Sequence, residues 1–215
     1  MTSRIGFVGV GRMGANMARR LKDKGYVITA VQDHNTAGAE SLARELSCEA
    51  ALTPARVAEL SDVVLTVVTD DAAMDEIFSE ESPSSLLCHA QDRLFINFAT
   101  ISPEAHMQAE HRVEGKGGTN IEALMASSIT QAREGTLYLM CGGKKSVFEQ
   151  ARSTLEALSS KLLYLLLSFI SIRKLLCVIQ KHPKKSTDIQ NIQRHPKTSK
   201  DNITRSNTSE DIKDV

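Results

Sequence analysis

The sequence predicts an α/β fold in which helices cover both faces of a doubly wound, mostly parallel sheet. Three observations favour this class. A glycine-rich turn joins an apolar run to an amphipathic segment near the start, strand and helix patterns then alternate, and several apolar runs are rich in β-branched residues. The chain has 215 residues, of which 41% are hydrophobic, so it can build a substantial core.

The first element is a predicted strand over Ile5–Val10, which leads through a GxGxxG turn into a helix that ends near Leu21. Each glycine has a separate expected role. Gly9 permits the sharp turn, Gly11 lets the backbone approach a pyrophosphate, and Gly14 lets the helix pack against the sheet. The free amides at the helix start favour an anion. The pattern predicts a Rossmann-type dinucleotide site.

The second predicted strand, Val27–Val31, ends beside Gln32 and Asp33. Asp33 lies about 20 residues beyond the last glycine of the turn, which is the spacing of this fingerprint. An acidic side chain there can accept hydrogen bonds from both ribose hydroxyls of an adenosine. The alternative is a glycine turn between a strand and a helix that binds no nucleotide.

The next segments continue the alternation of helix and strand. Helices are predicted over Thr36–Leu46 and Thr53–Leu60, the second with Thr53 as its N-cap and Pro54 as its first residue. The β-branched run Val63–Val68 predicts a strand covered on both faces. The segments that follow are a helix over Asp71–Phe78, a loop over Ser79–Ala90, a strand over Leu94–Phe98 and a polar helix from Ser102 to about Glu114.

The later segments complete a single dinucleotide-binding domain over residues 1–167. They are strands over Ile121–Met125, Thr136–Cys141 and Lys161–Leu167, a turn at Gly142-Gly143 and a helix over Ser146–Leu158. His106 and His111 belong to the polar helix after Ser102. Because they lack metal-ligand spacing, we expect both to face solvent.

The character of the chain changes near residue 160. From Lys161 onward there are 11 basic and 5 acidic residues, against 15 and 21 before it, and all 12 glycines lie at or before Gly143. Residues 168–180 are predicted to form a short helix. Residues 181–215 are poor in large hydrophobic side chains and cannot offset their ordering entropy, so they are predicted to be a disordered basic tail outside the folded domain.

Composition argues against several classes of protein. Lys+Arg and Asp+Glu both number 26, and the basic tail lacks interleaved aromatic residues, so nucleic acid is not an expected partner. The four cysteines are scattered, which predicts reduced thiols and no metal site. The apolar run Leu162–Ile172 is too short to span a membrane, and the first strand begins too close to Met1 for a signal peptide. The expected location is the cytoplasm.

Four motifs resemble those of the 3-hydroxyisobutyrate dehydrogenase family, the β-hydroxyacid dehydrogenases that share a nucleotide-binding domain with 6-phosphogluconate dehydrogenase. They are GVGRMGANMARRL at Gly9–Leu21, VVLTVVTDD at Val63–Asp71, INFATISP at Ile96–Pro103 and AREGTLYLMCGG at Ala132–Gly143. The resemblance implies an oxidoreductase that transfers a hydride between a nicotinamide cofactor and a small 3-hydroxy acid.

The resemblance also assigns a cofactor site. The pyrophosphate would lie against Gly9, Val10, Gly11, Arg12, Met13 and Gly14. Val68 and Thr69 would line the cofactor, and Thr100 would lie close to the nicotinamide. Asp33 would bind the adenosine ribose, and His34 follows it where NADP-preferring members carry arginine. Because a carboxylate repels a 2′-phosphate, NAD is favoured over NADP.

The substrate side departs from the family pattern. Family members have a Ser-Gly-Gly turn whose amides face a substrate carboxylate, and this chain has Ser127 and Ser128 there. These serines are candidate substrate contacts, or else part of a polar turn from a strand into a helix. Asn97 and Ala99 replace the Asp and the Ser of the family's D-x-S-T motif, which ends at Thr100.

The catalytic lysine helix and the all-helical domain of the family have no clear counterpart. Lys174 falls near the position of the family's general acid/base, but Val178 stands where that family has asparagine. The alternative for Lys174 is a solvated charge beside a short apolar helix. A hydrophilic tail in place of a domain suggests an altered C-terminus, from retained intron sequence or a shifted reading frame.

Two functions of different classes follow from these residues. One is a shortened NAD(P)-dependent dehydrogenase of doubtful activity that acts on a small 3-hydroxy acid. The other is a non-catalytic NAD(P)-binding module that pairs with a full-length homologue or with a second copy of itself. A third reading is a misfolded fragment that exposes the sheet face which the missing helices would cover.

Overall fold

The structure is a computed structural model and describes residues 3–165. The short helix predicted over 168–180 and the tail over 181–215 lie outside the described residues. The strands are β1 (Arg4–Val8), β2 (Val27–Gln32), β3 (Glu49–Ala50), β4 (Val63–Thr66), β5 (Leu94–Asn97), β6 (Thr119–Met125), β7 (Leu137–Gly142) and β8 (Ser159–Leu165). The helices are α1 (Arg12–Asp23), α2 (Thr36–Leu46), α3 (Pro54–Leu60), α4 (Asp71–Ile77), the 3₁₀ helix η1 (Leu86–His89), α5 (Pro103–Gly115), α6 (Ile129–Glu134) and α7 (Lys145–Leu158).

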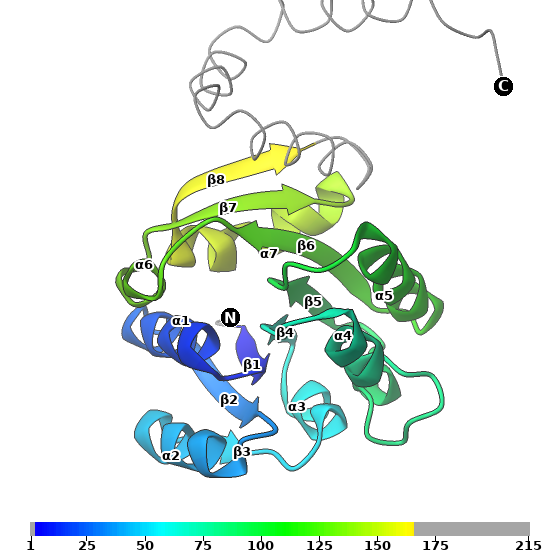
Figure 1. The fold of residues 1–215 in the computed structure, drawn as a ribbon, viewed down its shortest axis with the longest axis horizontal. Coiled ribbons are helices and arrows are strands. Elements are labelled where there is room, and N and C mark those ends of the chain that lie inside the picture. The colour runs from blue at the N-terminus through cyan, green and yellow to red at the C-terminus, as the bar shows by residue number, and fades with distance from the viewer. Residues whose placement is uncertain (1–2, 166–215) are drawn as a thin grey trace, which may run out of the picture. The chain divides into compact units, whose positions relative to one another are not determined.

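The described strands form one sheet in the order β3-β2-β1-β4-β5-β6-β7-β8 (Figure 1). The first six strands in this order run parallel to one another. β7 is antiparallel to β6, and β8 runs parallel to β7. The doubly wound, mostly parallel sheet predicted from the sequence is therefore confirmed. Its strand order reverses between β1 and β4, where sheets of this kind bind dinucleotides.

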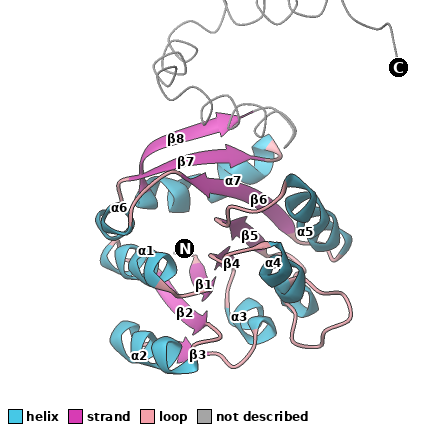
Figure 2. Ribbon diagram, viewed as in Figure 1, coloured by secondary structure: helices cyan, strands magenta, loops and turns pink. Residues whose placement is uncertain are grey.

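Helices cover both faces of the sheet (Figure 2). Each face has its own hydrophobic core. Residues of α1, α2 and α7 pack on one face, around fully buried side chains such as Phe7 and Leu155. Residues of α3, α4 and α5 pack on the other face, where the rings of Phe78 and Phe95 meet edge to face at 5.5 Å between centroids. The sheet is thus covered on both faces, as its β-branched strands predict.

Capping side chains fix where the helices on the second face begin. Thr53 accepts a hydrogen bond from the backbone N–H of Arg56 at 3.3 Å, and Pro54 is the first residue of α3, as predicted. Ser102 caps α5 in the same way, because its hydroxyl accepts from the N–H of Ala105 at 3.2 Å. Both helices therefore begin where the sequence places them.

Three short elements are not predicted by the sequence pattern. β3 has two residues and α6 has six. η1 lies inside the segment predicted to be a loop and buries Leu86 and Leu87, so that prediction is wrong at this point. Elements this short carry too little periodicity for apolar spacing to reveal them.

His106 faces the core, so the prediction that it faces solvent is wrong. It is 1% exposed and lies on the same side of α5 as the buried residues Ala109 and Val113. This spacing follows the helical period and could have placed His106 on the buried side of the helix. His111 on the same helix is exposed, as predicted.

The helix lengths, the cysteines and the metal-ligating side chains of residues 3–165 bear on the classes of protein that composition argues against. None of the helices between residues 3 and 165 is long and apolar enough to cross a membrane. Over the same residues, Cys48, Cys88 and Cys141 are free thiols, and no group of three side chains could hold a metal ion. Burial raises the pKa of the Cys141 thiol to about 12.

Candidate functional site

The turns after β1, β4 and β5 lie side by side because these strands are parallel neighbours. The pairing continues past the end of β4, where the N–H of Val67 donates to the carbonyl oxygen of Val8 at 2.8 Å. Predicted cofactor residues therefore meet at one edge of the sheet, namely those of the glycine turn, Val68, Thr69 and Thr100.

The three glycines of the first turn have different surroundings, and those of Gly9 and Gly14 agree with the structural roles expected of them. Gly9 has a φ of +87°, in the left-handed region, and a Cβ there would collide with the carbonyl oxygen of Val67. A Cβ on Gly14 would collide with the carbonyl oxygen of Gly9. No atom lies within 4 Å of the Cβ position of Gly11. The first and third glycines are thus required by packing, whereas the second faces open space.

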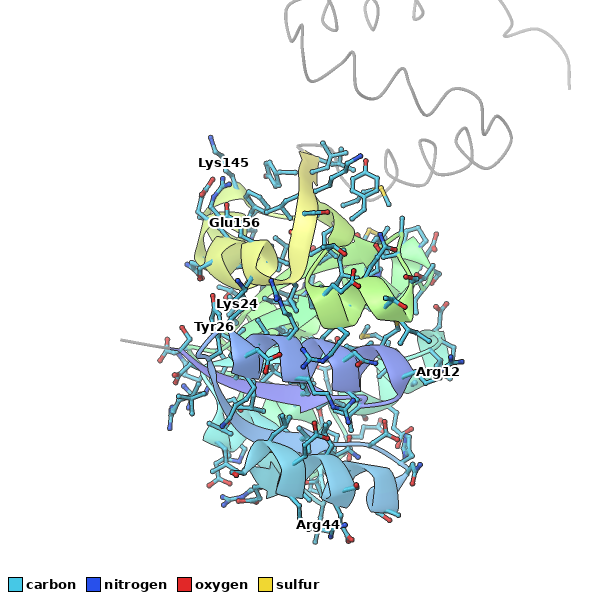
Figure 3. The ribbon with its side chains drawn as sticks, turned by 90° about the vertical axis from the view of Figure 1, so that its left-hand side faces the viewer. Arg12, Lys24, Tyr26, Arg44, Lys145 and Glu156 are labelled. Atoms are coloured by element: carbon cyan, nitrogen blue, oxygen red, sulfur yellow. The ribbon has the colours of Figure 1, made fainter. Side chains whose placement is uncertain are left out.

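α1 begins at this open space. Gly11 is its N-cap and offers no side chain to the first amides of the helix. Arg12 is exposed and extends from this end of α1 (Figure 3). Val10 and Met13 pack against the core, so they would meet a ligand through their backbone. Free amides at a helix start, beside a flexible cation, suit a diphosphate.

Asp33 reaches from the end of β2 to the glycine turn. Its Oδ2 accepts from the backbone N–H of Val10 at 2.7 Å, and its Oδ1 accepts from the N–H of Asn35 at 2.8 Å. A carboxylate offers about four acceptor positions, so two remain for ribose hydroxyls. Asp33, the predicted ribose-binding residue, therefore also connects the two turns that would hold the adenosine half of a cofactor.

His34 follows β2, and Thr69 follows β4 just before the start of α4. His34 is exposed, and its Nε2 is 3.8 Å from Oε2 of Glu76 on α4. Thr69 donates from its hydroxyl to Oδ2 of Asp70 at 2.9 Å, and Asp70 caps α4 by accepting from the N–H of Ala73. The backbone hydrogen bond from Ala73 and the Thr69 hydroxyl hold the pKa of Asp70 below its usual value. The residues after β4 are thus fixed at a helix start.

Thr100 and Asn97 have different surroundings although both belong to one motif. Thr100 is exposed beyond the end of β5. Asn97 is fully buried, and it accepts from Oγ1 of Thr66 at 2.5 Å and donates to Oδ1 of Asn120 at 2.9 Å. Asn97, the residue at the family's Asp position, therefore connects β4, β5 and β6 inside the sheet.

Ser127 and Ser128 form the turn from β6 into α6. The hydroxyl of Ser127 accepts from the N–H of Tyr138 at 2.8 Å. Ser128 is the N-cap of α6, and its hydroxyl and backbone N–H form a capping box with Gln131. Both serines therefore have structural roles. The candidate general acid/base, Lys174, lies outside the described residues.

A pair of buried titratable side chains, which the sequence analysis missed, lies next to the segment that carries Thr100. Nε2 of His106 is 3.3 Å from the carbonyl oxygen of Ala99 and 3.3 Å from Oε1 of Glu122 on β6. Burial, with the charge of Glu110 nearby, raises the pKa of Glu122 to about 8, and burial lowers the pKa of His106 to about 4. Burial thus favours the neutral form of both side chains.

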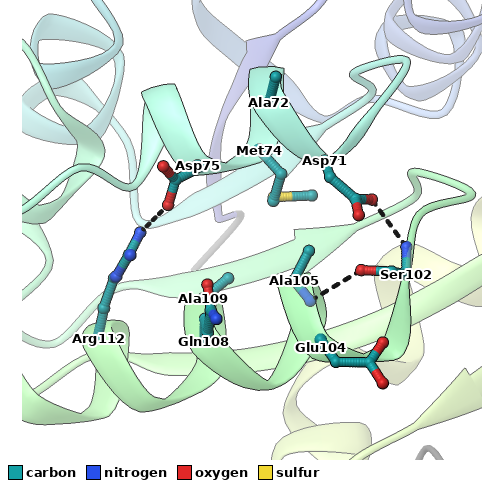
Figure 4. A pocket seen from close by; sticks show the side chains of 10 residues that line it. All are labelled: Asp71, Ala72, Met74, Asp75, Ser102, Glu104, Ala105, Gln108, Ala109 and Arg112. Carbon is teal, nitrogen blue, oxygen red and sulfur yellow. Dashed lines mark hydrogen bonds and ion pairs between the residues drawn. The ribbon is translucent and has the colours of Figure 1, made fainter.

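A cavity of about 300 Å³ lies between α4 and α5 (Figure 4). Two contacts join the helices across it: Asp71 accepts from the N–H of Ser102 at 2.8 Å, and Arg112 pairs with Asp75 at 2.5 Å. Its lining consists of Asp71, Ala72, Met74, Asp75, Ser102, Glu104, Ala105, Gln108, Ala109 and Arg112. None of the predicted cofactor residues lines this cavity.

Comparison with known families and curated proteins places the likeness in the described part of the chain. A family model described as the NAD binding domain of 6-phosphogluconate dehydrogenase matches residues 4–166. The mitochondrial 3-hydroxyisobutyrate dehydrogenase of Drosophila melanogaster is 30% identical over 158 residues, which are 74% of this chain and 47% of that protein. The cytokine-like nuclear factor N-PAC of Anopheles gambiae is 29% identical over 75% of this chain and 28% of its own length. The chain spans about half of the first of these relatives and less of the second.

The chain is also similar to solved structures. The 3-hydroxyisobutyrate dehydrogenase of Mycobacterium tuberculosis, solved with L-serine, aligns with a TM-score of 0.69 at 28% identity and covers 76% of this chain and 54% of its own. An imine reductase variant from Myxococcus stipitatus in complex with NAD+ aligns with a TM-score of 0.74 at 19% identity, covering 88% of this chain and 64% of its own. At that identity the second likeness concerns the fold alone.

Proposed function

The chain belongs to the family defined by the NAD binding domain of 6-phosphogluconate dehydrogenase, and on this premise we propose that it binds NAD at the carboxyl edge of the sheet. The pyrophosphate would lie against the backbone of Gly9–Gly14, the adenosine ribose against Asp33, and the nicotinamide beside Thr100. Val68 and Thr69 would line the cofactor between these ends.

The observation that carries this proposal is the open space at Gly11. The glycines on either side are crowded, yet Gly11 stands at the N-cap of α1 with no atom within 4 Å of its Cβ position. A phosphate can therefore approach the helix start without displacing protein atoms. Asp33 is bonded to the adjoining N–H of Val10, which places an acceptor for the ribose beside the same space.

Isothermal titration with NADH and NADPH tests the proposal. Gly11→Val should weaken NADH binding at least tenfold, because the valine side chain would occupy the open space in which the pyrophosphate is proposed to bind. Gly115→Val is the matched control, since Gly115 at the end of α5 also has no atom within 4 Å of its Cβ position. Folded wild-type protein that binds neither cofactor would refute the proposal, as would equal binding by the two variants.

We propose a preference for NAD over NADP from the charges near the ribose position. Asp33 would repel a 2′-phosphate. The nearest side chain on its C-terminal side, His34, lies 3.8 Å from the carboxylate of Glu76, which adds a second acidic group to this region. The measurement is the ratio of the two dissociation constants, and a tighter constant for NADPH would contradict this preference.

The reaction we propose is the transfer of a hydride between the cofactor and a small 3-hydroxy acid, as in the dehydrogenases among the relatives. The bound nicotinamide would supply or accept the hydride. Within the chain, Thr100 would border the ring, and Lys174 would exchange a proton with the substrate hydroxyl. Lys174→Ala should abolish turnover of a panel of 3-hydroxy acids while leaving NADH binding unchanged.

A second candidate function, an NAD(P)-binding module without catalysis, is favoured by the turn at 126–128. The N–H of Ala126 donates to Tyr138, and the N–H of Ser128 donates to the side chain of Gln131. Two of the amides that would face a substrate carboxylate are therefore already used. Under this alternative NADH binds, no 3-hydroxy acid is turned over, and the chain associates with a full-length homologue or a second copy in light-scattering measurements.

A further inference from the structure

The carboxyl ends of β4 and β5 are connected to each other and to the first part of β6 by buried polar side chains. Thr66 donates to Asn97, and Asn97 donates to Asn120, at 2.5 and 2.9 Å. These three side chains are at most 1% exposed, and Thr66 and Asn97 are the last residues of their strands. The bonds therefore lie directly beneath the turns that carry the predicted cofactor residues.

His106 and Glu122 form a second buried polar pair, which reaches the backbone next to Thr100. His106 comes from α5 and Glu122 from β6, and their side chains are 1% and 4% exposed. The Nε2 atom of His106 lies 3.3 Å from the carbonyl oxygen of Ala99 and 3.3 Å from Oε1 of Glu122. Because the carbonyl oxygen of Ala99 can only accept, its hydrogen bond with His106 places the imidazole proton on Nε2.

We propose that His106 and Glu122 are positioning residues, which hold the Ala99–Thr100 segment in place for the nicotinamide half of the cofactor. The inference rests on the proposed dinucleotide binding. His106 reaches the segment through the Ala99 carbonyl, and Glu122 holds the imidazole through the same nitrogen. Neither side chain reaches the surface, so neither contacts the cofactor itself.

Ionisation of Glu122 would disturb this arrangement. A charged carboxylate is a stronger acceptor than a backbone carbonyl, so it would draw the Nε2 proton of His106 away from Ala99. Among the described residues, the elements packed around the pair offer few positive charges that could balance an ionised Glu122. Their titratable groups are Asp71 on α4, Glu110 and Glu114 on α5, Cys141 on β7, and Lys144, which is already paired with Glu114 at 2.6 Å. The position of Thr100 should therefore depend on the protonation of Glu122.

The test compares NADH with ADP-ribose, which has the adenosine and pyrophosphate but no nicotinamide. Titrations of the full chain at pH 7 and pH 9.5 give the ratio of the two dissociation constants. We expect NADH to lose about fivefold in affinity relative to ADP-ribose at the higher pH. The ratio should stay constant in Glu122→Gln, whose side chain cannot ionise. A constant ratio in the wild type, or an equal change in Glu122→Gln, would overturn the proposal.

Variants of His106 give a second readout at pH 7. His106→Leu loses the hydrogen bond to Ala99 and should weaken NADH about fivefold relative to ADP-ribose. His106→Gln can place an amide N–H near the position of Nε2 and should restore most of that loss. His111→Leu, at an exposed position of the same helix, is the control and should match the wild type. Equal losses for NADH and ADP-ribose in His106→Leu would refute a positioning role.

The comparison also separates this inference from the proposed function. Wild-type protein that binds neither NADH nor ADP-ribose at pH 7 would refute dinucleotide binding and the positioning role together. Wild-type protein that binds both ligands, with an affinity ratio that changes neither with pH nor in His106→Leu, would refute the positioning role alone.

Discussion

Asp33 serves both the fold and the proposed cofactor site. Its two oxygens hold the amides of Val10 and Asn35, so the carboxylate is fixed before a ribose could reach it. A side chain that is already held loses little entropy when a ligand binds. The sequence predicted the ribose contact from spacing, but the bond to Val10 depends on how the two turns meet in space.

Asp33→Asn should therefore change cofactor choice as well as affinity. We expect NADH binding to weaken about tenfold, since an amide offers one acceptor oxygen and no charge. NADPH should weaken less, because the repulsion of its 2′-phosphate is removed. Titration of both cofactors measures this, and Glu40→Gln at an exposed position of α2 is the control. Equal weakening of NADH and NADPH would contradict the assigned role.

Gly14 is a residue at which packing alone predicts a loss of stability. A Cβ there would collide with the carbonyl oxygen of Gly9. Gly14→Ala should lower the free energy of unfolding by about 1–3 kcal/mol. Gly115→Ala, where the Cβ would enter open space, should leave stability unchanged or raise it slightly. Urea unfolding of both variants decides the matter.

The buried pair predicts how stability varies with pH. The pKa of Glu122 rises from 4.5 to about 8 on folding, and the pKa of His106 falls from 6.5 to about 4. Between pH 4.5 and 6.5 the folded chain binds a proton at Glu122 and the unfolded chain binds one at His106, so their effects on the slope cancel. From pH 6.5 to 8 only folded Glu122 is protonated, and stability should fall by about 2 kcal/mol.

Urea unfolding at pH 6.5 and pH 8.5 measures this change. Glu122→Gln should remove the loss, because its side chain does not titrate. The same loss in the variant would assign the slope to other groups. The sequence could have indicated a buried His106 from its helical spacing to Ala109 and Val113 on α5. Its contact with Glu122 depends on the packing of α5 against β6.

Among the secondary-structure elements, α5 depends on its N-cap residue, Ser102, for its position at the carboxyl edge. The Ser102 hydroxyl caps the helix, and its backbone N–H donates to Asp71 at the start of α4. Ser102→Ala should lower the free energy of unfolding by about 1 kcal/mol, because the first turn of α5 loses its cap. Ser146→Ala, at an exposed position of α7, should have almost no effect in the same denaturation experiment.

The elements that sequence could predict are those with a long periodic pattern. α2 runs over Thr36–Leu46 as predicted, and the buried strands fall within a few residues of their predicted ends. The antiparallel direction of β7 could not be read from apolar spacing, since a strand has the same pattern in either direction. It follows from the connection: β6 and β7 are joined through the six-residue α6, too short for the crossover that a parallel pair requires.

At the scale of the whole described part, the two hydrophobic cores share one sheet and should unfold together. Phe95 on one face and Leu155 on the other are both fully buried. Phe95→Ala and Leu155→Ala should each lower stability by about 3–4 kcal/mol. Circular dichroism should show one transition that shifts as a whole in either variant. Two separate transitions would mean that the two faces unfold independently.

α1 is also anchored at the end away from the glycine turn. Arg20 donates to the carbonyl oxygen of Ala157 across 137 positions of sequence, and Arg133 forms an ion pair with Asp23. The helix that would bind the pyrophosphate is thus held by contacts with α6 and α7, which follow the six parallel strands in the chain. A fragment of the chain that ends after β6 would lack both contacts. The segment from α6 to β8 therefore belongs to the smallest part of the domain that can fold alone.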